Sequence, residues 1–385
     1  MNGHRTLTAV DLFSGAGGFS LAARETGIKV MAAVEIDKNA GKTYKKNFVI
    51  GHDTPPVFIE DDIVDLDPFE LMKKSGLSIG ECDILMGGPP CQGFSTHRLK
   101  GSGVDDPRNK LLIRYFDFVR AIKPKAFIVE NVSGLLWPRH AEYLNKFLRM
   151  TKQAGYIIYG PTLLNAKDFG VPQNRKRVFI IGIRSDLKVE LIWPPKQTHF
   201  SLISKEVKKR GLPAWQTAST VFQEPIPTND PNSIHMNHSN ELIGVFQSTP
   251  KNGGSRSQSN RILSCHGNHD GHKDVYGRID PNKLGPTITT GCVNPSKGRF
   301  LHPTENHGIS VRHAARFQTF PDDFIFEGGL MSCAVQIGNA VPIKMGKVII
   351  KSVANVLETI SCSDLKMEIV TNCKLSVGNE NRVHV

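Results

Sequence analysis

The sequence predicts an α/β protein in which a parallel, doubly wound sheet is joined to a smaller and irregular second region. Three observations lead to this prediction. Short apolar segments rich in Val and Ile alternate with amphipathic segments over the first half of the chain. From about residue 186 this periodicity stops, and Asn, Ser, Gly, Pro, Lys and His interrupt any regular spacing. Regular apolar spacing returns near residue 335.

The apolar segments of the first half have the composition of strands that are buried on both faces of a sheet. They are TAVDLF (8–13), KVMAAVEI (29–36), CDILMGG (82–88), AFIVENV (126–132) and KRVFIIGIR (176–184). A further strand is expected to end near Asp62. Between the strands, FSLAARETG, KNAGKTYKKNF and NKLLIRYFDFVRAI carry apolar residues at helical spacing. Alternation of strands and helices indicates parallel strands with helices on both faces of the sheet.

The changes in texture divide the chain into four parts. We expect residues 1–185 to form the large domain, residues 186–325 the irregular domain, residues 326–362 a helical segment that returns to the large domain, and residues 363–385 a polar tail. The total of 385 residues is enough for one large and one smaller domain.

Composition restricts the functional class. No apolar run approaches the roughly 18 residues that cross a bilayer, and the first residues lack the pattern of a secretory signal, so we expect a cytoplasmic protein without a membrane partner. The seven cysteines include no CxxC pair, which argues against a disulfide framework or a four-thiolate zinc site. The formal net charge of +12 favours a polyanionic partner such as nucleic acid.

The segment DLFSGAGGFS follows a strand and begins a helix, which is where α/β sheets bind nucleotides. Gly15 and Gly17 allow a ligand close to the backbone, but Ser20 stands where a dinucleotide fingerprint requires glycine. Glu35 ends the second strand, where a carboxylate can accept hydrogen bonds from ribose hydroxyls, and Asp62 could accept from an adenine amino group. The set predicts an adenosine-containing ligand. The alternative is a tight turn with acids that cap helices.

The segment MGGPPCQGFS places Cys91 directly after a strand, where Pro89 and Pro90 restrict its backbone. A thiol at this edge of the sheet is a candidate nucleophile, although most lone cysteines are small buried hydrophobic residues. Glu130 ends the next strand and is expected beside Cys91, because parallel strands present their carboxyl ends together. The alternative is that Glu130 pairs with a buried arginine.

The segment PQNRKRVF carries Arg175 and Arg177 two positions apart. On extended backbone, such residues point the same way. We therefore expect both guanidinium groups to face one spot, where they would suit a carbonyl or phosphate oxygen.

Six segments together resemble the DNA (cytosine-5) methyltransferases, in the usual unpermuted motif order of that family. They are residues 11–20, 87–95, 129–132, 173–177, 311–321 and 336–342, and the resemblance spans nearly the whole chain. It implies a Rossmann-like S-adenosylmethionine-dependent methyltransferase domain over residues 1–185. It also implies a target-recognition domain over residues 186–325 and a C-terminal segment that returns to the catalytic domain.

The resemblance implies a role for each matching residue. Cys91 matches the nucleophile, Glu130 the acid beside the flipped base, and Arg177 the contact to cytosine O2, with Arg175 in support. The implied cofactor contacts are Phe13, Gly15, Gly17, Glu35, Ile36, Asp62, Ile63, Pro89, Asn339 and Val341. We also expect residues 92–104 to form a mobile catalytic loop, followed by a family motif at 105–109, and Thr287 to lie near the target.

The implied reaction transfers a methyl group from S-adenosylmethionine to carbon 5 of a flipped-out cytosine, through a covalent cysteine adduct. The implied substrate is a specific sequence in double-stranded DNA. We expect a monomer that acts in a restriction-modification system beside a separate cognate restriction endonuclease. No metal site is expected, because the cluster SCHGNHDGH does not have the spacing of a zinc finger; its candidate ligands are Cys265, His266, His269 and His272.

Three other functions stay open at this point. An RNA methyltransferase could use the same nucleophile, and a DNA-binding module without activity could keep the fold. The intact Cys91, Glu130 and Arg177 argue against the inactive module. A nicotinamide oxidoreductase is disfavoured by Ser20 and gives no reason for the PPCQ segment.

Overall fold

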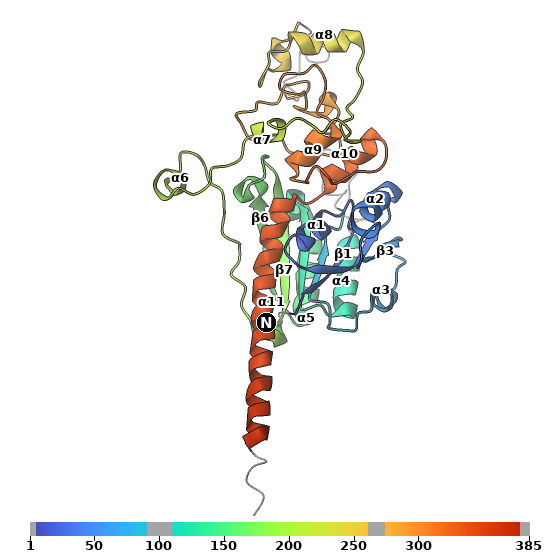
Figure 1. Ribbon diagram of the computed structural model, residues 1–385, viewed down its shortest axis with the longest axis vertical. Coiled ribbons are helices and arrows are strands. Elements are labelled where there is room, and N and C mark those ends of the chain that lie inside the picture. Colours follow the sequence, from blue (N-terminus) through green and yellow to red (C-terminus); the bar gives the residue numbers. More distant parts are fainter. Residues whose placement is uncertain (1–4, 91–109, 261–273, 378–385) are drawn as a thin grey trace, which may run out of the picture.

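A seven-stranded sheet forms the centre of the larger domain in the computed structural model (Figure 1). The structure describes residues 5–90, 110–260 and 274–377. The strand order is β3-β2-β1-β4-β5-β7-β6. The strands are β1 Thr8–Leu12, β2 Lys29–Glu35, β3 Val57–Glu60, β4 Ile84–Gly87, β5 Ala126–Val132, β6 Tyr156–Asn165 and β7 Lys176–Arg184.

The sheet is mixed, so the expectation of a wholly parallel sheet is wrong at one side. Strands β1 to β5 run parallel to one another, whereas β7 runs antiparallel to both β5 and β6. A parallel connection needs a crossover of about a dozen residues or more. Only residues 166–175 join β6 to β7, and they hold a single 3-10 turn, so β7 must return alongside β6.

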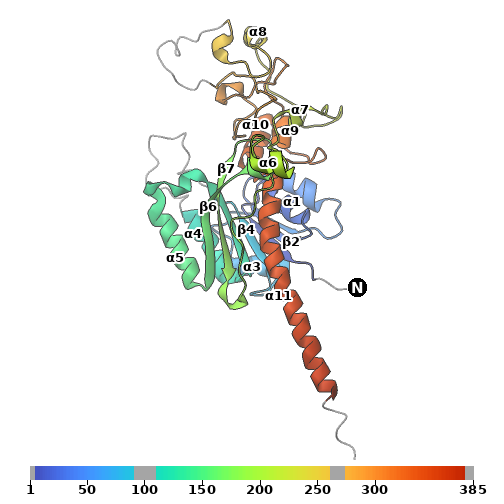
Figure 2. The ribbon, with the colours of Figure 1, turned by 90° about the vertical axis from the view of Figure 1, so that its left-hand side faces the viewer.

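Helices cover both faces of the sheet, and alternate residues of each strand point to opposite faces. In β4, for example, Ile84 and Met86 join the core on one face and Leu85 joins the core on the other. Figure 2 shows the sheet between the two helical layers. One layer contains α1 Gly18–Arg24, α2 Lys38–Tyr44 and α11 Ile343–Val377, and the other contains α3 Pro68–Ser75, α4 Lys110–Ile122 and α5 Ala141–Gln153.

The second domain has little regular structure, as its sequence texture predicts. Its helices are α6 Lys205–Arg210, α7 Ser219–Phe222 and α8 Asn240–Ser248. Helices α9 Val311–Phe317 and α10 Leu330–Asn339 follow and lead back to the sheet. Its apolar core is continuous with one face of the sheet, because Phe300 and Phe317 belong to the same buried cluster as Ile181 of β7. The buried Arg312 of α9 forms an ion pair with Asp230, which ties α9 to the preceding irregular segment.

The last helix is longer than the sequence analysis predicts. Residues 363–377 continue α11, so the expected polar tail is helical over that range. No proline follows Ile343 and no glycine follows Gly346 within the helix, so nothing in the backbone ends it earlier. Figure 1 shows its C-terminal half extending beyond the sheet. Among the residues that the structure describes, no helix is both long enough and apolar enough to cross a membrane.

Gly182 tests how tightly β7 packs on β5. Its register partner is Phe127, and a methyl group at Gly182 would overlap the Phe127 ring. That ring is buried among Tyr115, Phe147 and Tyr156 and has no free space to enter. Gly182→Ala is therefore expected to lower the free energy of unfolding by about 1–3 kcal/mol, measured by urea denaturation.

The matched control is Gly244→Ala in α8. No atom lies within 4 Å of the added methyl group there, so the substitution should leave stability unchanged or raise it by up to about 1 kcal/mol. Equal losses in the two variants would contradict the packing argument.

Candidate active site

A cavity of about 280 Å³ opens at the carboxyl ends of β1, β2 and β3. This is the edge at which open α/β sheets hold their ligands. Five of the ten expected cofactor residues line it, and they come from three separate segments of the chain. The lining residues are Phe13, Val34, Glu35, Ile36, Asp61, Asp62, Ile63, Val64, Pro90 and Leu111.

The glycine turn after β1 is held by Glu35. Its Oε2 accepts a hydrogen bond from the Gly15 N–H at 2.8 Å, and its Oε1 accepts from the Ile36 and Asp37 N–H groups at 3.0 and 2.8 Å. Burial raises the pKa of Glu35, and the backbone donors act in the opposite direction. Phe13 adopts a left-handed backbone conformation with φ of 58°, which is rare for a bulky residue and is typical of functional turns.

The last expected cofactor segment lies against this glycine turn. A methyl group at Gly18 would come within 2.9 Å of the Val341 carbonyl oxygen, so the start of α1 and the turn after α10 touch at backbone level. Val341 is buried and Asn339 is exposed at the end of α10. Gly17 is left-handed and faces the Phe48 ring, whereas Gly15 faces open space. The fold therefore brings together segments that are far apart in sequence.

The residues present fit an adenosine-containing cofactor. Phe13, Ile36 and Ile63 offer apolar surface to a purine, and the carboxylates of Glu35 and Asp62 can accept hydrogen bonds from hydroxyl and amino groups. The open space at Gly15 leaves room for a ligand beside the turn. The alternative role as a helix or turn cap is also present, because Asp62 Oδ1 accepts from the Val64 N–H at 2.9 Å.

Asp11 lies beneath the same turn and is buried. Its Oδ2 accepts hydrogen bonds from the Ser20 N–H at 3.0 Å and the Ser20 hydroxyl at 2.7 Å. The Ser20 hydroxyl is also 2.9 Å from the Tyr44 hydroxyl. Asp11 Oδ1 has no hydrogen-bond partner within the described structure, and burial raises the pKa of the carboxyl to about 7. Ser20, the residue that departs from the dinucleotide pattern, is therefore the partner of a buried acid.

Glu130 and Arg177 form a buried ion pair at the end of β5. The distance from Arg177 Nε to Glu130 Oε1 is 2.8 Å, and Glu130 is only 7% exposed. Burial raises the pKa of Glu130, while the charges of Arg177 and Arg175 act to lower it. Glu130 Oε2 would lie 3.3 Å from a methyl group at Gly88, so the pair is next to the segment that leads to Cys91. The pairing with an arginine that sequence analysis left open is present.

Arg175 does not share a target with Arg177, so the expectation that both guanidinium groups face one spot is wrong. Arg175 is fully buried and donates hydrogen bonds to the carbonyl oxygens of Ile288, Gly338 and Ala340 at 2.6, 2.7 and 3.1 Å. The reason is that Arg175 precedes β7, which begins at Lys176, so the alternation of a strand does not apply to the two residues.

Two positioning residues were missed by sequence analysis. Asn131 Nδ2 donates a hydrogen bond to the Pro89 carbonyl oxygen at 3.2 Å and so holds the backbone two residues before Cys91. Gln173 donates to the Phe317 carbonyl oxygen at 2.7 Å, and its side-chain oxygen accepts from the Ile288 N–H at 3.0 Å. Their partners are backbone atoms, which any residue supplies. In the sequence, only their position within the segments 129–132 and 173–177 could have indicated that they matter.

Several expected residues lie outside the described part of the chain. These are Cys91, the catalytic loop 92–104, the segment 105–109 and the cluster Cys265, His266, His269 and His272. Thr287 is described, and its hydroxyl donates to the Asn174 carbonyl oxygen at 2.5 Å, directly before Arg175. Among the described residues, no group of three or more His, Cys, Asp or Glu side chains is arranged to hold a metal ion.

Comparison with known proteins places this geometry in context. Residues 7–355 match the family described as C-5 cytosine-specific DNA methylase. The Type II methyltransferase M1.HphI of Haemophilus parahaemolyticus is 32% identical over 90% of this chain and 87% of that protein. The Type II methyltransferase M.DdeI of Desulfomicrobium norvegicum is 30% identical over 98% of this chain and 97% of that protein. A prophage-encoded putative DNA modification methyltransferase from Escherichia coli has a TM-score of 0.69 at 26% identity, covering 91% of this chain and 99% of that structure.

The raised pKa of Asp11 predicts a pH-dependent loss of stability. The folded protein keeps this proton up to about pH 7, whereas the unfolded chain releases it near the ordinary value of 3.8. The folded state therefore binds more protons between these values, and this contribution to stability falls as pH rises from about 4 to 7. Asp11→Asn keeps an oxygen acceptor for Ser20 and does not titrate.

The measurement is urea unfolding of both proteins between pH 5 and 8. The stability of Asp11→Asn relative to the wild type should increase by at most roughly 3 kcal/mol between pH 5 and about pH 7 and then level off. Other titrating groups are present in both proteins and cancel in the difference. A difference that is constant with pH would show that Asp11 is already ionised in the folded state.

Proposed function

The chain belongs to the C-5 cytosine-specific DNA methylase family, and from this premise we propose how its own residues carry out the reaction. It is an S-adenosylmethionine-dependent DNA (cytosine-5) methyltransferase. The observation that carries the mechanism is the buried pair of Glu130 and Arg177, next to the segment that leads to Cys91. We assign Cys91, Glu130 and Arg177 to the substrate and Arg175 to their support.

Cys91 acts as the nucleophile in this proposal. Its thiolate adds to carbon 6 of the flipped cytosine, and the electron pair of the 5,6 double bond makes carbon 5 nucleophilic. S-adenosylmethionine supplies the methyl group that carbon 5 takes. Loss of the proton from carbon 5 then restores the double bond as the Cys91 sulfur leaves, so the thiolate is regenerated. Asn131 supports the approach of this residue, because it fixes the Pro89 carbonyl.

Glu130 and Arg177 stabilise the charge that develops on the ring. Glu130 in its protonated form can donate a hydrogen bond to N3, and burial, which raises the pKa of Glu130, acts in the direction of proton uptake. The guanidinium group of Arg177 can donate to O2, the neighbouring atom on the same edge of cytosine. Because the two side chains already contact each other, they present one continuous polar edge to the base.

The proposed cofactor contacts are assigned from the residues that line the cavity. We propose that Phe13, Ile36 and Ile63 enclose the adenine, that Glu35 binds the ribose hydroxyls and that Asp62 binds the adenine amino group. Gly15 and Gly17 allow the close approach, and the remaining contacts come from Pro89, Asn339 and Val341.

The two domains have separate roles in this proposal. We propose that residues 1–185 and 326–362 form the catalytic domain and that residues 186–325 read the target sequence. The relatives named above are Type II methyltransferases. We accordingly propose that this enzyme acts in the cytoplasm as a monomer and protects DNA from a separate cognate restriction endonuclease.

Replacement of the nucleophile separates chemistry from binding. Cys91→Ala should abolish transfer of labelled methyl groups to duplex DNA and should keep DNA and cofactor binding. Glu130→Gln should lower kcat by about 10²–10⁴-fold, because a neutral amide cannot deliver a proton. With duplex DNA that carries 5-fluorocytosine, the wild type should form a covalent adduct that Cys91→Ala cannot form.

The control is Cys82→Ala, at the opposite end of β4, which should still form the adduct. Bisulfite sequencing of DNA from cells that express the enzyme will identify the target, and tRNA serves as the competing substrate. Turnover by Cys91→Ala, or methyl transfer to tRNA alone, would end the proposal.

Arg175 and Arg177 should respond differently to the same substitution. Arg177→Lys replaces a planar guanidinium group, which can donate to the base, with a single ammonium group. It should lower kcat with little change in KM for S-adenosylmethionine. Arg175→Lys cannot reach all three carbonyl oxygens of Ile288, Gly338 and Ala340. It should raise KM for both DNA and S-adenosylmethionine. A fall in kcat alone in Arg175→Lys would instead place this residue at the substrate.

A further inference from the structure

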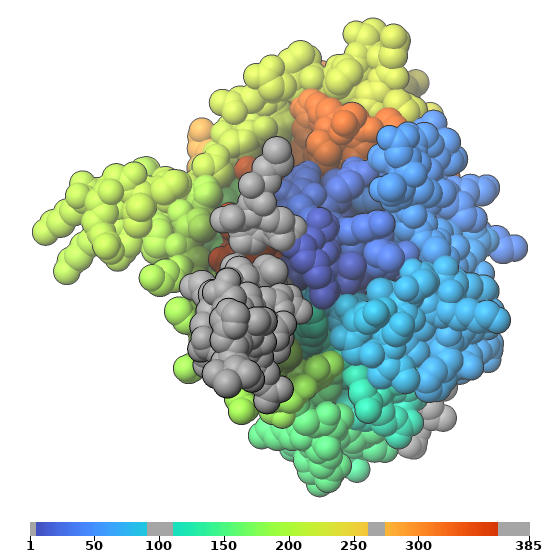
Figure 3. Space-filling view, turned by 60° about the horizontal axis from the view of Figure 1, so that its bottom comes forward, coloured from blue at the N-terminus to red at the C-terminus, as the bar shows by residue number. Residues whose placement is uncertain are grey.

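A short helical excursion, residues 198–215, extends from the body of the molecule and has no part in the site described above. We call it the finger. It carries α6 at its tip, and Figures 1 and 3 both show it projecting to the side. We infer that the finger binds the sugar-phosphate backbone of duplex DNA that flanks the target site. This inference rests on the proposed methylation of duplex DNA.

The base of the finger is fixed to the catalytic domain. The two ends of the finger are joined by two backbone hydrogen bonds. The Phe200 N–H donates to the Pro213 carbonyl oxygen at 2.9 Å, and the Trp215 N–H donates to the Phe200 carbonyl oxygen at 2.8 Å. The His199 N–H donates to the Asp168 carbonyl oxygen at 3.1 Å, and Trp215 Nε1 donates to Asp168 Oδ1 at 3.0 Å. The finger is therefore attached at a defined place and is not a loose loop.

A cation contact strengthens the same base. The ammonium group of Lys167 lies 3.3 Å from the centre of the Trp215 ring. Such contacts are favourable by about 0.5–2 kcal/mol, depending on burial. Lys167 belongs to the turn between β6 and β7, so the finger is anchored close to the strand that carries Arg177.

The tip presents a dense group of positive charges. The helix is capped at its start by the Ser204 hydroxyl, which accepts from the Val207 N–H at 3.3 Å, and it ends at the left-handed Gly211. Four exposed cations lie on this helix with only one acidic residue, Glu206. Within the described parts of the chain none of the four has an ion-pair partner; they are Lys205, Lys208, Lys209 and Arg210.

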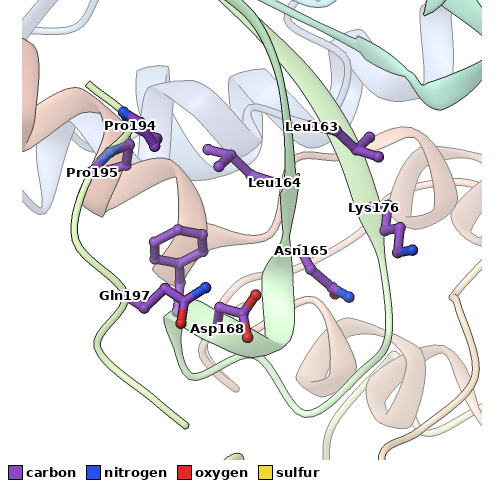
Figure 4. A pocket seen from close by; sticks show the side chains of 9 residues that line it. Leu163, Leu164, Asn165, Asp168, Lys176, Pro194, Pro195 and Gln197 are labelled. Carbon is purple, nitrogen blue, oxygen red and sulfur yellow. The ribbon is translucent and has the colours of Figure 1, made fainter.

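A groove lies beside the base of the finger, and Asp168, which accepts a hydrogen bond from Trp215, is one of its lining residues. It has a volume of about 250 Å³ and lies between the end of β6, the start of β7 and the segment that enters the finger (Figure 4). Lys176 and Asn165 extend from the strands, with Pro194, Pro195 and Gln197 across the groove. Lys176 directly precedes Arg177 in the chain. Figures 1 and 2 place α6 level with the boundary between the sheet and α9 and α10.

The positive charge of the finger favours a DNA backbone over a protein as its binding partner. Each phosphate that a cation neutralises releases counterions, so exposed lysines on a fixed support favour the DNA backbone. The apolar alternative is small, since the exposed large apolar side chains of the finger are Leu202 (70% exposed), Ile203 (77% exposed) and Leu212 (38% exposed). A stable protein interface covers about 800 Å² per partner, far more than these three side chains supply. The finger therefore fits a phosphate backbone better than a protein partner.

The test compares two charge-matched triple variants. Lys208→Gln/Lys209→Gln/Arg210→Gln neutralises the finger, and Lys146→Gln/Arg149→Gln/Lys152→Gln removes two exposed lysines and one exposed arginine from α5. Fluorescence anisotropy measures Kd for a short duplex with the target site and for a long duplex that adds several helical turns on each side. Binding is recorded over a range of salt concentrations.

The finger variant should bind the long duplex at least about tenfold more weakly at low salt. Its slope of log K against log salt should fall by about 2–3, at roughly 0.9 per phosphate contact. Binding and methylation of the short duplex should stay at the wild-type level, and the α5 variant should behave as the wild type on both duplexes.

Three results would overturn the inference. They are an equal loss on both duplexes, no loss on either, and a loss that the α5 variant reproduces. A change in self-association of Leu202→Ser/Ile203→Ser, with normal DNA binding by the finger variant, would assign the surface to a protein. Binding is measured without turnover, so a finger effect in a protein that transfers no methyl group would contradict the proposed function alone.

Discussion

The architecture depends on one buried guanidinium group, that of Arg175. It joins the start of β7 to backbone oxygens at residue 288 of the second domain and at residues 338 and 340 of the turn after α10. Burial lowers the pKa of Arg175, which shows how costly a charge is at this place. Three carbonyl dipoles offset that cost, and together with Gln173 they hold the second domain and the turn after α10 against the start of β7, next to the Glu130–Arg177 pair.

Buried arginines that donate to backbone carbonyl oxygens also occur in the irregular parts of the second domain. Irregular backbone leaves carbonyl oxygens without partners, and a guanidinium group offers five donors in a fixed plane. Arg278 donates to the carbonyl oxygens of residues 246, 249, 302 and 305. Arg312 donates to those of residues 321 and 324 and pairs with Asp230. Buried arginines thus take the place of strand and helix hydrogen bonds in this domain.

The sequence predicts well which residues meet at the cavity beside β1, β2 and β3, because the determinants of this arrangement are local. Phe13, Glu35 and Asp62 each follow a parallel strand, and parallel strands bring their ends to one edge. The reversed direction of β7 was missed because β6, with its Gly-Pro step, does not stand out as a strand. The target of Arg175 could not be found in sequence, because its partners are backbone oxygens that any residue supplies. The roles of Cys91 and of the recognition domain stay predictions.

The place of α11 has a consequence for synthesis on the ribosome. Its apolar residues, among them Ile349, Ile350 and Val353, belong to the buried cluster on one face of the sheet, and its Gly346 lies against Ala22 of α1. The nascent chain therefore leaves part of this apolar cluster uncovered until α11 has been translated. The turn at Val341 also arrives late. Chains that end before Val341 lack the turn that packs against the start of α1, so this contact forms only after α10 has been made.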